Sequence, residues 1–296
     1  MNNFSRIPFS LNDKFFCTKE EFITAVSALS STDSPKYKDI IEDEFPVIRK
    51  MADNISISTD YNSESLPDGT LAYYRIKGVI LSESDYAFSS RNFERDLLLA
   101  DQNPSVSCHF LHITSGGGEA WYLDRLSETM RTLTKPVYTL VEKVCASAAY
   151  YIGCHGTLIK AVTQNDTIGS IGTMVSFIDI QPFFEKMGFK FIEEYATKST
   201  LKNKKYNDLI SGKPEQYIAD ELDPLQSQFE TEVRNSRKQL AALPENHPVF
   251  LGETFSATKA CELGLIDGIV TFPEAVQEAY ILGKEWNIRN KAYSFV

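Results

Sequence analysis

The chain has 296 residues, of which 43% are hydrophobic and 24% are charged, the balance of a globular protein and not of a disordered one. It carries 40 acidic against 30 basic residues, so it lacks the overall positive field that general nucleic-acid binding requires. The length fits one large domain or two small ones.

Five cysteines without a CxxC spacing argue against a disulfide framework or a thiolate zinc site, and favour a reducing compartment. They are Cys17, Cys108, Cys145, Cys154 and Cys261. The first residues lack the apolar core of a signal peptide, and no run of about 18 apolar residues suggests a membrane span. We therefore expect a cytoplasmic protein that needs no metal or other cofactor.

The first 70 residues are polar and weakly periodic, and we interpret them as an extension with one short helix over 19–29. From residue 71 strands and helices alternate, which predicts an α/β fold with a largely parallel sheet. A bend or bulge is expected at Gly78. The expected strands are 71–81, 105–115, 137–144 and 157–162, and the expected helices are 92–101, 119–133 and 146–154.

The second half of the chain predicts a strand over 189–196 and a long polar helix over 214–242, interrupted near Pro224. Residues 256–270 predict a helix followed by a strand. Ser256 can cap this helix, and Gly264 can end it in the left-handed region. A final helix over 273–284 closes the chain.

The segment Ser115–Gly118 follows an apolar strand and precedes a helix. Glycines let the backbone turn tightly and present bare N–H groups, which can hold a phosphate or the oxyanion of acyl transfer. Neither GxxxxGK[ST] nor GxGxxG is present, which speaks against phosphate. The segment is either an oxyanion turn or a simple tight turn.

Ser147 lies where an apolar strand meets an alanine-rich helix. Negative charge that develops there is stabilised by the helix dipole, and the small neighbours leave room for a substrate backbone. The other interpretation is a plain helix N-cap.

A nucleophilic serine needs a base. None of the four histidines, His109, His112, His155 and His247, stands in an obvious triad context. The sequence offers Lys198 instead, which can accept a proton only if desolvation or a nearby cation lowers its pKa. A run of lysines follows it, so the segment can equally be a solvated loop.

Taken together, these segments resemble the signal peptide peptidase A (protease IV) family of Ser/Lys peptidases. The resemblance extends over about residues 71–282 and includes 115–118, 146–151, 168–172, 197–199 and 260–267. It implies a Clp protease/crotonase-like fold of repeated β-β-α units, with an N-terminal extension (1–70), a peptidase domain (71–282) and a C-terminal tail (283–296). Membrane-bound members of the family carry an N-terminal anchor. Because the sequence shows no such segment, we expect the chain to resemble the soluble or phage-associated branch. A helical arm is also expected.

The resemblance implies Ser147 as nucleophile and Lys198 as general base, with Lys202 as the fallback. It also implies that Gly117 or Gly118, together with Ala148, forms the oxyanion hole. Ser170 is the residue expected to orient the lysine. Gly116 replaces the proline of the family turn and Thr197 replaces the usual aromatic residue or histidine, and this second change leaves the choice of lysine open.

The expected function is a serine endopeptidase that cleaves peptides or unfolded protein segments through an acyl-enzyme. Family members of this length form rings, so we expect a homo-oligomer whose active sites are completed by neighbouring subunits. Three alternatives remain: a crotonase-type acyl-CoA enzyme, a phage-type capsid or scaffold processing or assembly protein, and a Clp-type Ser/His/Asp hydrolase. No nucleic-acid partner is expected.

Overall fold

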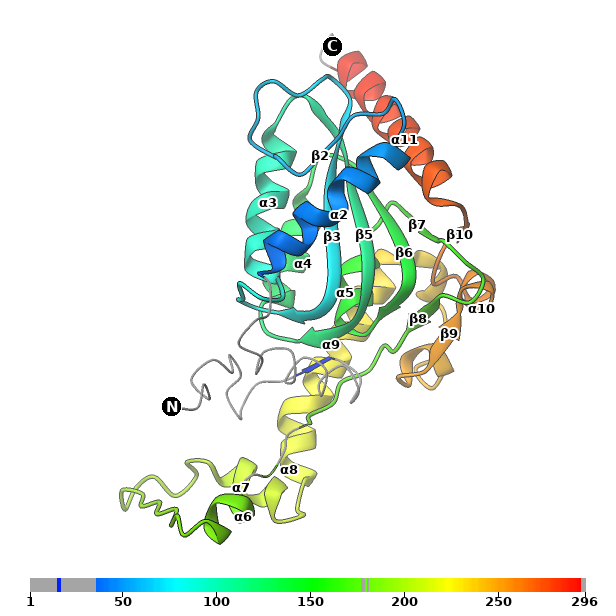
Figure 1. Cartoon of the computed structure of the whole chain (residues 1–296). Coiled ribbons are helices and arrows are strands. Elements are labelled where there is room, and N and C mark those ends of the chain that lie inside the picture. The colour runs from blue at the N-terminus through cyan, green and yellow to red at the C-terminus, as the bar shows by residue number, and fades with distance from the viewer. Residues whose placement is uncertain (1–14, 17–35, 177–178, 180, 294–296) are drawn as a thin grey trace.

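In the computed structural model, residues 15–16, 36–176, 179 and 181–293 are described. Figure 1 shows a body built on one sheet, from which an arm of short helices projects. The helix expected over 19–29, and Cys17, lie outside the described residues.

The sheet of the body has ten strands, and the α/β class with a mostly parallel sheet is confirmed. Its central path runs β10-β7-β6-β5-β3-β2 with parallel pairs throughout. β4 and β8 add parallel pairs, whereas β1 and β9 pair antiparallel with β5 and β8. The strands are β1 (Phe15–Phe16), β2 (Ile57–Ser58), β3 (Thr70–Leu81), β4 (Phe88–Ser89), β5 (Val106–Glu119), β6 (Val137–Ala146), β7 (Leu158–Ala161), β8 (Thr167–Gly169), β9 (Thr254–Ser256) and β10 (Gly268–Ile269).

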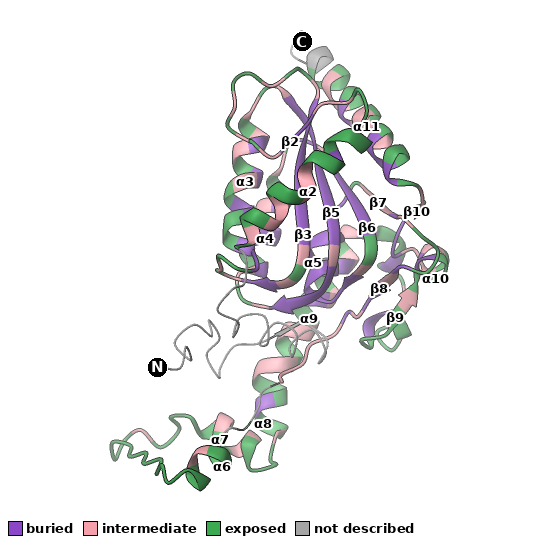
Figure 2. Cartoon of the chain, in the orientation of Figure 1, coloured by how far each residue is buried: buried purple, intermediate pink, exposed green. Residues whose placement is uncertain are grey.

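Helices cover both faces of the sheet, which is why its strands read as nearly continuous apolar runs. One face packs against α3 (Ser90–Gln102), α4 (Leu123–Thr132), α5 (Ala148–Gly153) and α9 (Asp223–Ser236). The other packs against α2 (Tyr37–Met51) and α11 (Phe272–Tyr293). Figure 2 shows the strands buried between these two layers.

Two predicted helix signals are confirmed after α9. Ser256 caps α10 (Ala257–Leu263) by accepting a hydrogen bond from the N–H of Lys259, and Gly264 ends the helix with a φ of 85°. Short 3-10 turns at Lys238–Leu240 and Pro248–Phe250 connect α9 to β9. Because local chemistry specifies these boundaries, they are readable without knowledge of the rest of the fold.

The irregularity expected at Gly78 is present and sets the register near the candidate site. The pairing of β3 with β5 shifts between Lys77 and Val79, and Gly78 has a φ of 75°. Beyond the shift, Val79 pairs with Gly117 and Ile80 with Gly118. The bulge therefore decides which residues of β3 lie beside the glycine segment.

The arm contains α6 (Gln181–Lys186), α7 (Lys204–Ile210) and α8 (Glu215–Tyr217). A π-helical turn over Ile218–Leu222 joins α8 to α9. Pro224 stands directly after this π-helical turn, at the start of α9, so the expected interruption is a change of helix type.

The strand expected over 189–196 is wrong, because these residues are exposed and pair with no strand of the described sheet. An alternating apolar pattern does not suffice for a strand when no neighbour offers hydrogen bonds.

Both proposed domain boundaries fall inside a secondary-structure element, β3 at residues 70/71 and α11 at residues 282/283. β2 pairs with the first residues of β3, and Ile48 of α2 packs in the core of the sheet. At the other end, α11 runs through residue 283 without a break. The division at residues 70/71 and 282/283 stays a prediction.

Candidate active site

The carboxyl ends of three neighbouring strands bring most of the predicted site residues together. β5 and β6 pair at Ser115 and Cys145, and β6 and β8 pair at Ala146 and Gly169. The glycine segment after Ser115 therefore lies at the same edge of the sheet as Ser147, because adjacent strands are about 4.8 Å apart. This edge is where open parallel sheets bind their ligands.

Ser147 occupies the junction between β6 and α5 in a strained conformation. Its φ of 55° and ψ of −123° cost a residue with a side chain about 1–3 kcal/mol. Its N–H donates to the carbonyl oxygen of Gly169 at 2.8 Å, and its carbonyl accepts from the N–H of Tyr151 at 2.9 Å. Although Ser147 stands at the N-cap position, its hydroxyl makes no capping hydrogen bond. Capping therefore does not explain the serine.

Ser170 lies beside Ser147 because it directly follows the paired residue Gly169. It also has a positive φ, 52°, and its N–H donates to the carbonyl oxygen of Glu253 at 2.7 Å. The structure thus brings two strained serines to adjacent strand ends.

The tight turn expected over Ser115–Gly118 is wrong, because the glycines continue strand β5 and pair with β3. Glycine is nevertheless required there. A Cβ on Gly118 would lie 1.9 Å from the carbonyl oxygen of Ile80, so no side chain fits. Gly117 has a φ of 115°, and its N–H donates to Oγ of Ser115 at 3.1 Å. Oγ of Ser115 in turn donates to the carbonyl of Gly78 at 2.6 Å. The Ser115 side chain therefore links the glycine segment of β5 to the bulge in β3 through two hydrogen bonds.

Lys198 is not brought to Ser147 within one chain. It lies between α6 and α7 on the arm, which Figure 1 shows projecting away from α5. Its side chain is exposed, as is that of Lys202. Within the described residues, no hydrogen bond or ion pair joins Ser147 to either lysine. One chain therefore presents the candidate nucleophile and the candidate base on different parts of the molecule.

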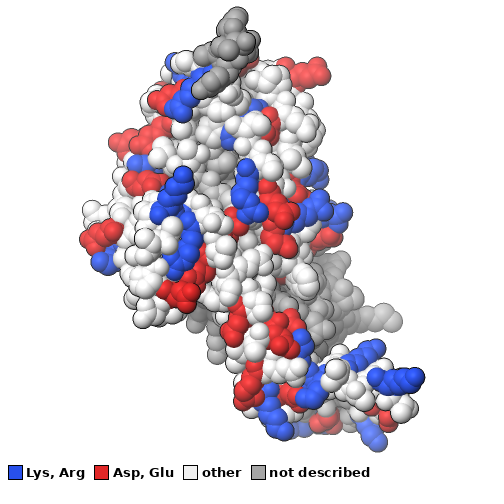
Figure 3. Space-filling model, turned by 180° about the vertical axis from the view of Figure 1, so that it is seen from behind, with Lys and Arg blue, Asp and Glu red and all other residues white. Residues whose placement is uncertain are grey.

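The arm exposes large apolar side chains. Ile192 is 72% exposed and Leu201 75%, and the nearby residues Phe183, Met187 and Phe189 are each more than half exposed. Lysines are interspersed with them, and Figure 3 shows basic side chains across the end of the arm. Several large apolar side chains exposed on one short segment are unusual for a surface that has no partner.

Two of the histidines are structural. His109 and His112 point to opposite faces of β5, as their spacing predicts, and both are buried. Nδ1 of His112 lies 2.8 Å from Oη of Tyr73, and Nε2 lies 2.9 Å from the Glu142 carboxylate. On the other face, Nδ1 of His109 lies 2.9 Å from Oη of Tyr74. With both ring nitrogens engaged inside the sheet, neither histidine acts on Ser147.

His155 is engaged as well, with Glu232 of α9. Its Nε2 lies 2.9 Å from that carboxylate, which also accepts from Arg131 of α4. Burial would raise the pKa of Glu232, but the hydrogen bonds from His155 and Arg131 outweigh it and hold this pKa at about 2. This cluster fastens α9 to α4 and α5.

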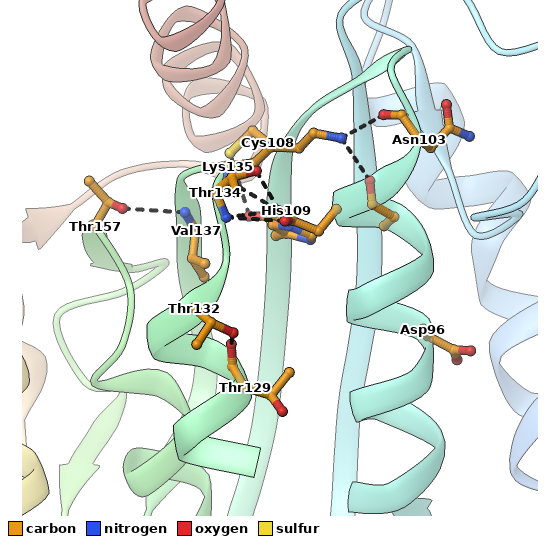
Figure 4. A network of polar contacts seen from close by, with 12 residues as sticks. Asp96, Asn103, Cys108, His109, Thr129, Thr132, Thr134, Lys135, Val137 and Thr157 are labelled. Atoms are coloured by element: carbon orange, nitrogen blue, oxygen red, sulfur yellow. Dashed lines mark hydrogen bonds and ion pairs between the residues drawn. The ribbon is translucent and has the colours of Figure 1, made fainter. Parts of the chain in front are cut away.

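A lysine that sequence reasoning missed lies at the opposite end of the sheet. Nζ of Lys135 is buried and donates to the carbonyl oxygens of Ala100 and Asn103 at 2.8 and 2.5 Å, as Figure 4 shows. Burial lowers its pKa to about 8. Because it precedes β6 and Ser147 follows that strand, the two lie roughly 30 Å apart. Its partners are main-chain groups, so no sequence motif marks it.

Beside Lys135, the Asp101 carboxylate accepts hydrogen bonds from His109 and from the backbone of Thr134 and Lys135, and Figure 4 shows part of this network. Burial opposes its charge, but these donors hold the pKa of Asp101 well below its usual range. The network fixes the entry into β6 and so supports the strand that carries Ser147.

A cavity of about 700 Å³ lies between α2, α3 and the open edge of β3, and neither Ser147 nor Lys198 lines it. Over the described part of the chain, no group of three or more His, Cys, Asp or Glu side chains is arranged to hold a metal ion. None of the helices described combines the length and apolar character needed to cross a bilayer.

The sequence profile of peptidase family S49 matches residues 130–285, more than half of the chain. The chain therefore belongs to peptidase family S49, and the family predicted from the sequence is confirmed. The matched residues include Ser147, Ser170 and Lys198.

A curated relative is the putative signal peptide peptidase SppA of Enterococcus faecium, which is 24% identical over 231 residues. The alignment covers 72% of this chain and 64% of that protein, so the chain spans less than two thirds of its relative.

Two solved structures are similar at low sequence identity. A substrate-bound mutant of the membrane-bound stomatin-specific protease 1510-N has a TM-score of 0.44 and 11% identity, over 73% of this chain and 80% of its own. An enoyl-CoA hydratase/isomerase family member has a TM-score of 0.42 and 15% identity, over 75% and 74%.

Proposed function

We propose that this protein is a serine endopeptidase that cleaves peptides or unfolded protein segments with Ser147 as nucleophile and Lys198 as general base. The observation that carries the proposal is the backbone of Ser147. A strained serine at a strand–helix junction, with a hydroxyl that makes no capping hydrogen bond, lies at the same end of the sheet as Gly118 of β5, where only glycine fits. Strain of this kind is found at functional sites.

The base comes from a neighbouring copy of the chain in this proposal. Lys198 is on the arm, remote from the Ser147 of its own body, and the arm exposes apolar side chains that a second copy would cover. Docking of the arm would also desolvate Lys198, which lowers the pKa of an ammonium group and lets it accept a proton. The oligomer is thus a condition for catalysis.

The reaction begins when Oγ of Ser147 attacks the peptide carbonyl and its proton passes to the neutral amine of Lys198. The N–H of Gly117 or Gly118 and the N–H of Ala148 stabilise the oxyanion. Lys198 returns the proton to the leaving amine, so the C–N bond breaks and an acyl-enzyme forms. Water then hydrolyses the ester, and Ser170 orients the lysine.

Labelling with a fluorophosphonate probe, followed by mass spectrometry, tests the nucleophile. We expect the probe on Ser147 in the wild type, and none in Ser147→Ala or Lys198→Ala. Lys202→Ala is the matched control, since this lysine lies on the same segment; if it alone abolishes labelling, Lys202 is the base. An unlabelled wild-type oligomer would contradict the proposal and favour an acyl-CoA enzyme or an assembly protein.

Mixing the two inactive variants tests whether the lysine comes from a neighbour. In a mixed oligomer of Ser147→Ala and Lys198→Ala chains, some sites combine an intact serine with an intact lysine from another copy. Random assembly at equal amounts restores about a quarter of the sites. If no activity returns although the chains are shown to mix, the dyad forms within one chain.

The cytoplasmic location stays a prediction.

A further inference from the structure

The arm joins the body through two legs, which lie side by side in Figure 1. One leg is the extended chain after β8, residues 170–176, and the other is the π-helical turn Ile218–Leu222 that leads into α9. Oγ1 of Thr173 on the first leg lies 2.9 Å from Oε1 of Gln226 and 3.4 Å from the carbonyl oxygen of Leu222. Hydrogen bonds therefore hold the two legs together at this point.

Gln226 uses both ends of its side-chain amide here. While Oε1 accepts from Thr173, Nε2 donates to the carbonyl oxygen of Ile171 at 3.3 Å and to that of Phe250 at 3.0 Å. The carbonyl of Ile171 also accepts from the N–H of Gly252 at 3.1 Å. One side chain on α9 thus holds the first leg and the 248–252 turn together.

We call the contacts of Gln226 with Thr173, Ile171 and Phe250 the latch. The latch is continuous with the candidate active site. Ile171 follows Ser170, and the N–H of Ser170 donates to Glu253, immediately after the turn that Gln226 holds. The preceding residue, Gly169, accepts from the N–H of Ser147. Any shift of the first leg therefore reaches both serines through bonded neighbours.

The second leg contains the feature that makes a latch necessary. A π-helical turn has wider and weaker hydrogen bonding than an α-helix, and it is a common place for a helix to change direction. Directly after it, Pro224 removes one more backbone donor from the helix. The side chains of Thr173 and Gln226 supply the restraint that the helix lacks there.

We propose that Gln226 is a positioning residue that, together with Thr173, fixes the angle between the arm and the body. The arm carries Lys198, so this angle decides where the lysine meets the Ser147 of a neighbouring copy. The inference rests on the proposed function and extends it. Because a misplacement of about 1 Å costs roughly 100-fold in rate, loosening the latch should be visible in catalysis.

The experiment compares Gln226→Ala and Thr173→Val with the wild type, with Ser227→Ala on the same helix as the control, because the Ser227 hydroxyl donates to the carbonyl of Asp223 within that helix. We expect kcat to fall ten- to 100-fold in the two latch variants, with KM within about threefold, because substrate still binds the body. Thr173→Ser keeps the hydroxyl and should restore kcat. Hydrogen exchange of residues 171–176 should accelerate in the latch variants and not in Ser227→Ala.

The inference is overturned if Ser147 of the wild type reacts with the probe but kcat is unchanged in both latch variants. The proposed function would then remain intact. A fall in kcat that Thr173→Ser shares with Thr173→Val would also overturn it, since the hydroxyl would then be irrelevant. Thermal unfolding checks that each variant is folded. If the wild type itself shows no reactive Ser147, the proposed function fails first, and the inference fails with it.

Discussion

The body and the arm of this molecule treat apolar residues in opposite ways. In the body, side chains such as Leu111 and Ile113 are fully buried between two helical layers, whereas Phe189 and Ile192 of the arm are mostly exposed. Figure 2 shows this contrast between the buried strands and the exposed helices α6 and α7. The body carries its own core, whereas these side chains of the arm are left in contact with solvent.

The aromatic residues of the arm show how little it stabilises itself. Phe184 makes ring contacts with Phe183, Phe189 and Phe191 at centroid distances of 5.6, 5.7 and 6.4 Å, but the other three rings stay more than half exposed. A pair of such rings contributes about 0.5–1.5 kcal/mol beyond the area it buries. The arm therefore buries few of its own apolar side chains, which is the surface that the proposed docking onto a second copy requires.

The largest effect is expected at Gly118, where β5 lies against the backbone of β3. Gly118→Ala places a Cβ against the backbone of Ile80, so a strand must shift. We expect unfolding free energy to fall by about 3 kcal/mol and probe labelling of Ser147 to fall more than tenfold. Gly78→Ala is the control, because its Cβ meets nothing within 4 Å and only its positive φ is strained. Equal effects in both variants would contradict the close-contact argument.

Next in size is the cluster that holds α9 against the body. Glu232→Gln leaves His155 and Arg131 without their carboxylate and is expected to lower the unfolding free energy by about 3 kcal/mol in chemical denaturation. The control is Glu230→Gln on the same helix, which breaks only an i,i+4 pair with Arg234 and should cost about 0.5 kcal/mol. Similar losses in the two variants would mean that the buried cluster adds nothing.

The stabilisation by this cluster should depend on pH from both sides. The pKa of Glu232 is lowered from 4.5 to about 2, so its contribution is present above pH 4.5 and is lost as the pH falls towards 2. Burial would lower the pKa of His155, but the adjoining Cys154 sulfur and Glu232 carboxylate raise it above 6.5. The contribution of His155 is therefore complete below pH 6.5 and is lost at higher pH.

Denaturation of wild type and Glu232→Gln across pH measures this window. The difference in unfolding free energy between them is expected to be largest from about pH 4.5 to 6.5. A difference that does not change between pH 2 and pH 9 would exclude charge as its source.

The smallest effect on stability is expected in the arm, with a clear effect on assembly. Ile192→Asp changes a side chain that is 72% exposed, so unfolding free energy should move by less than about 0.5 kcal/mol. Oligomer dissociation, measured by analytical ultracentrifugation, should become at least tenfold easier, since a charge would be buried in the interface. Ile288→Asp on α11 is the matched control, and an equal change there would remove the arm from the interface.

The contrast between body and arm also explains what the sequence could predict. Local pattern and chemistry predict β3, β5, β6 and β7 of the body, the bulge at Gly78 and the cap at Ser256, and all are present. They do not predict the short strands β2, β4, β8 and β9. Residues 189–196 show the same alternation as a strand but have no partner, so local pattern misleads there.

In the site, the sequence predicts the glycine segment, Ser147 and Ser170, and the structure gathers them at one end of the sheet. It does not predict that the glycines continue strand β5, since that depends on pairing with β3. Lys198 was named as well, but its distance from Ser147 was not foreseen from the segment alone. The Gln226 latch was missed because its partners lie 24 to 55 residues away in the chain and are mainly backbone groups. Contacts of that range leave no spacing signature.

Two adjacent tyrosines of β3 have a consequence for the accuracy of the sheet. Tyr73 and Tyr74 point to opposite faces, and each hydroxyl meets a different histidine of β5. If β3 slipped by one residue, each tyrosine would turn to the wrong face, and both hydrogen bonds would be lost together. Two hydrogen bonds, one on each face, thus stabilise the correct register of β3 before the bulge at Gly78. A misaligned β3 is therefore destabilised at residues that lie away from the candidate site.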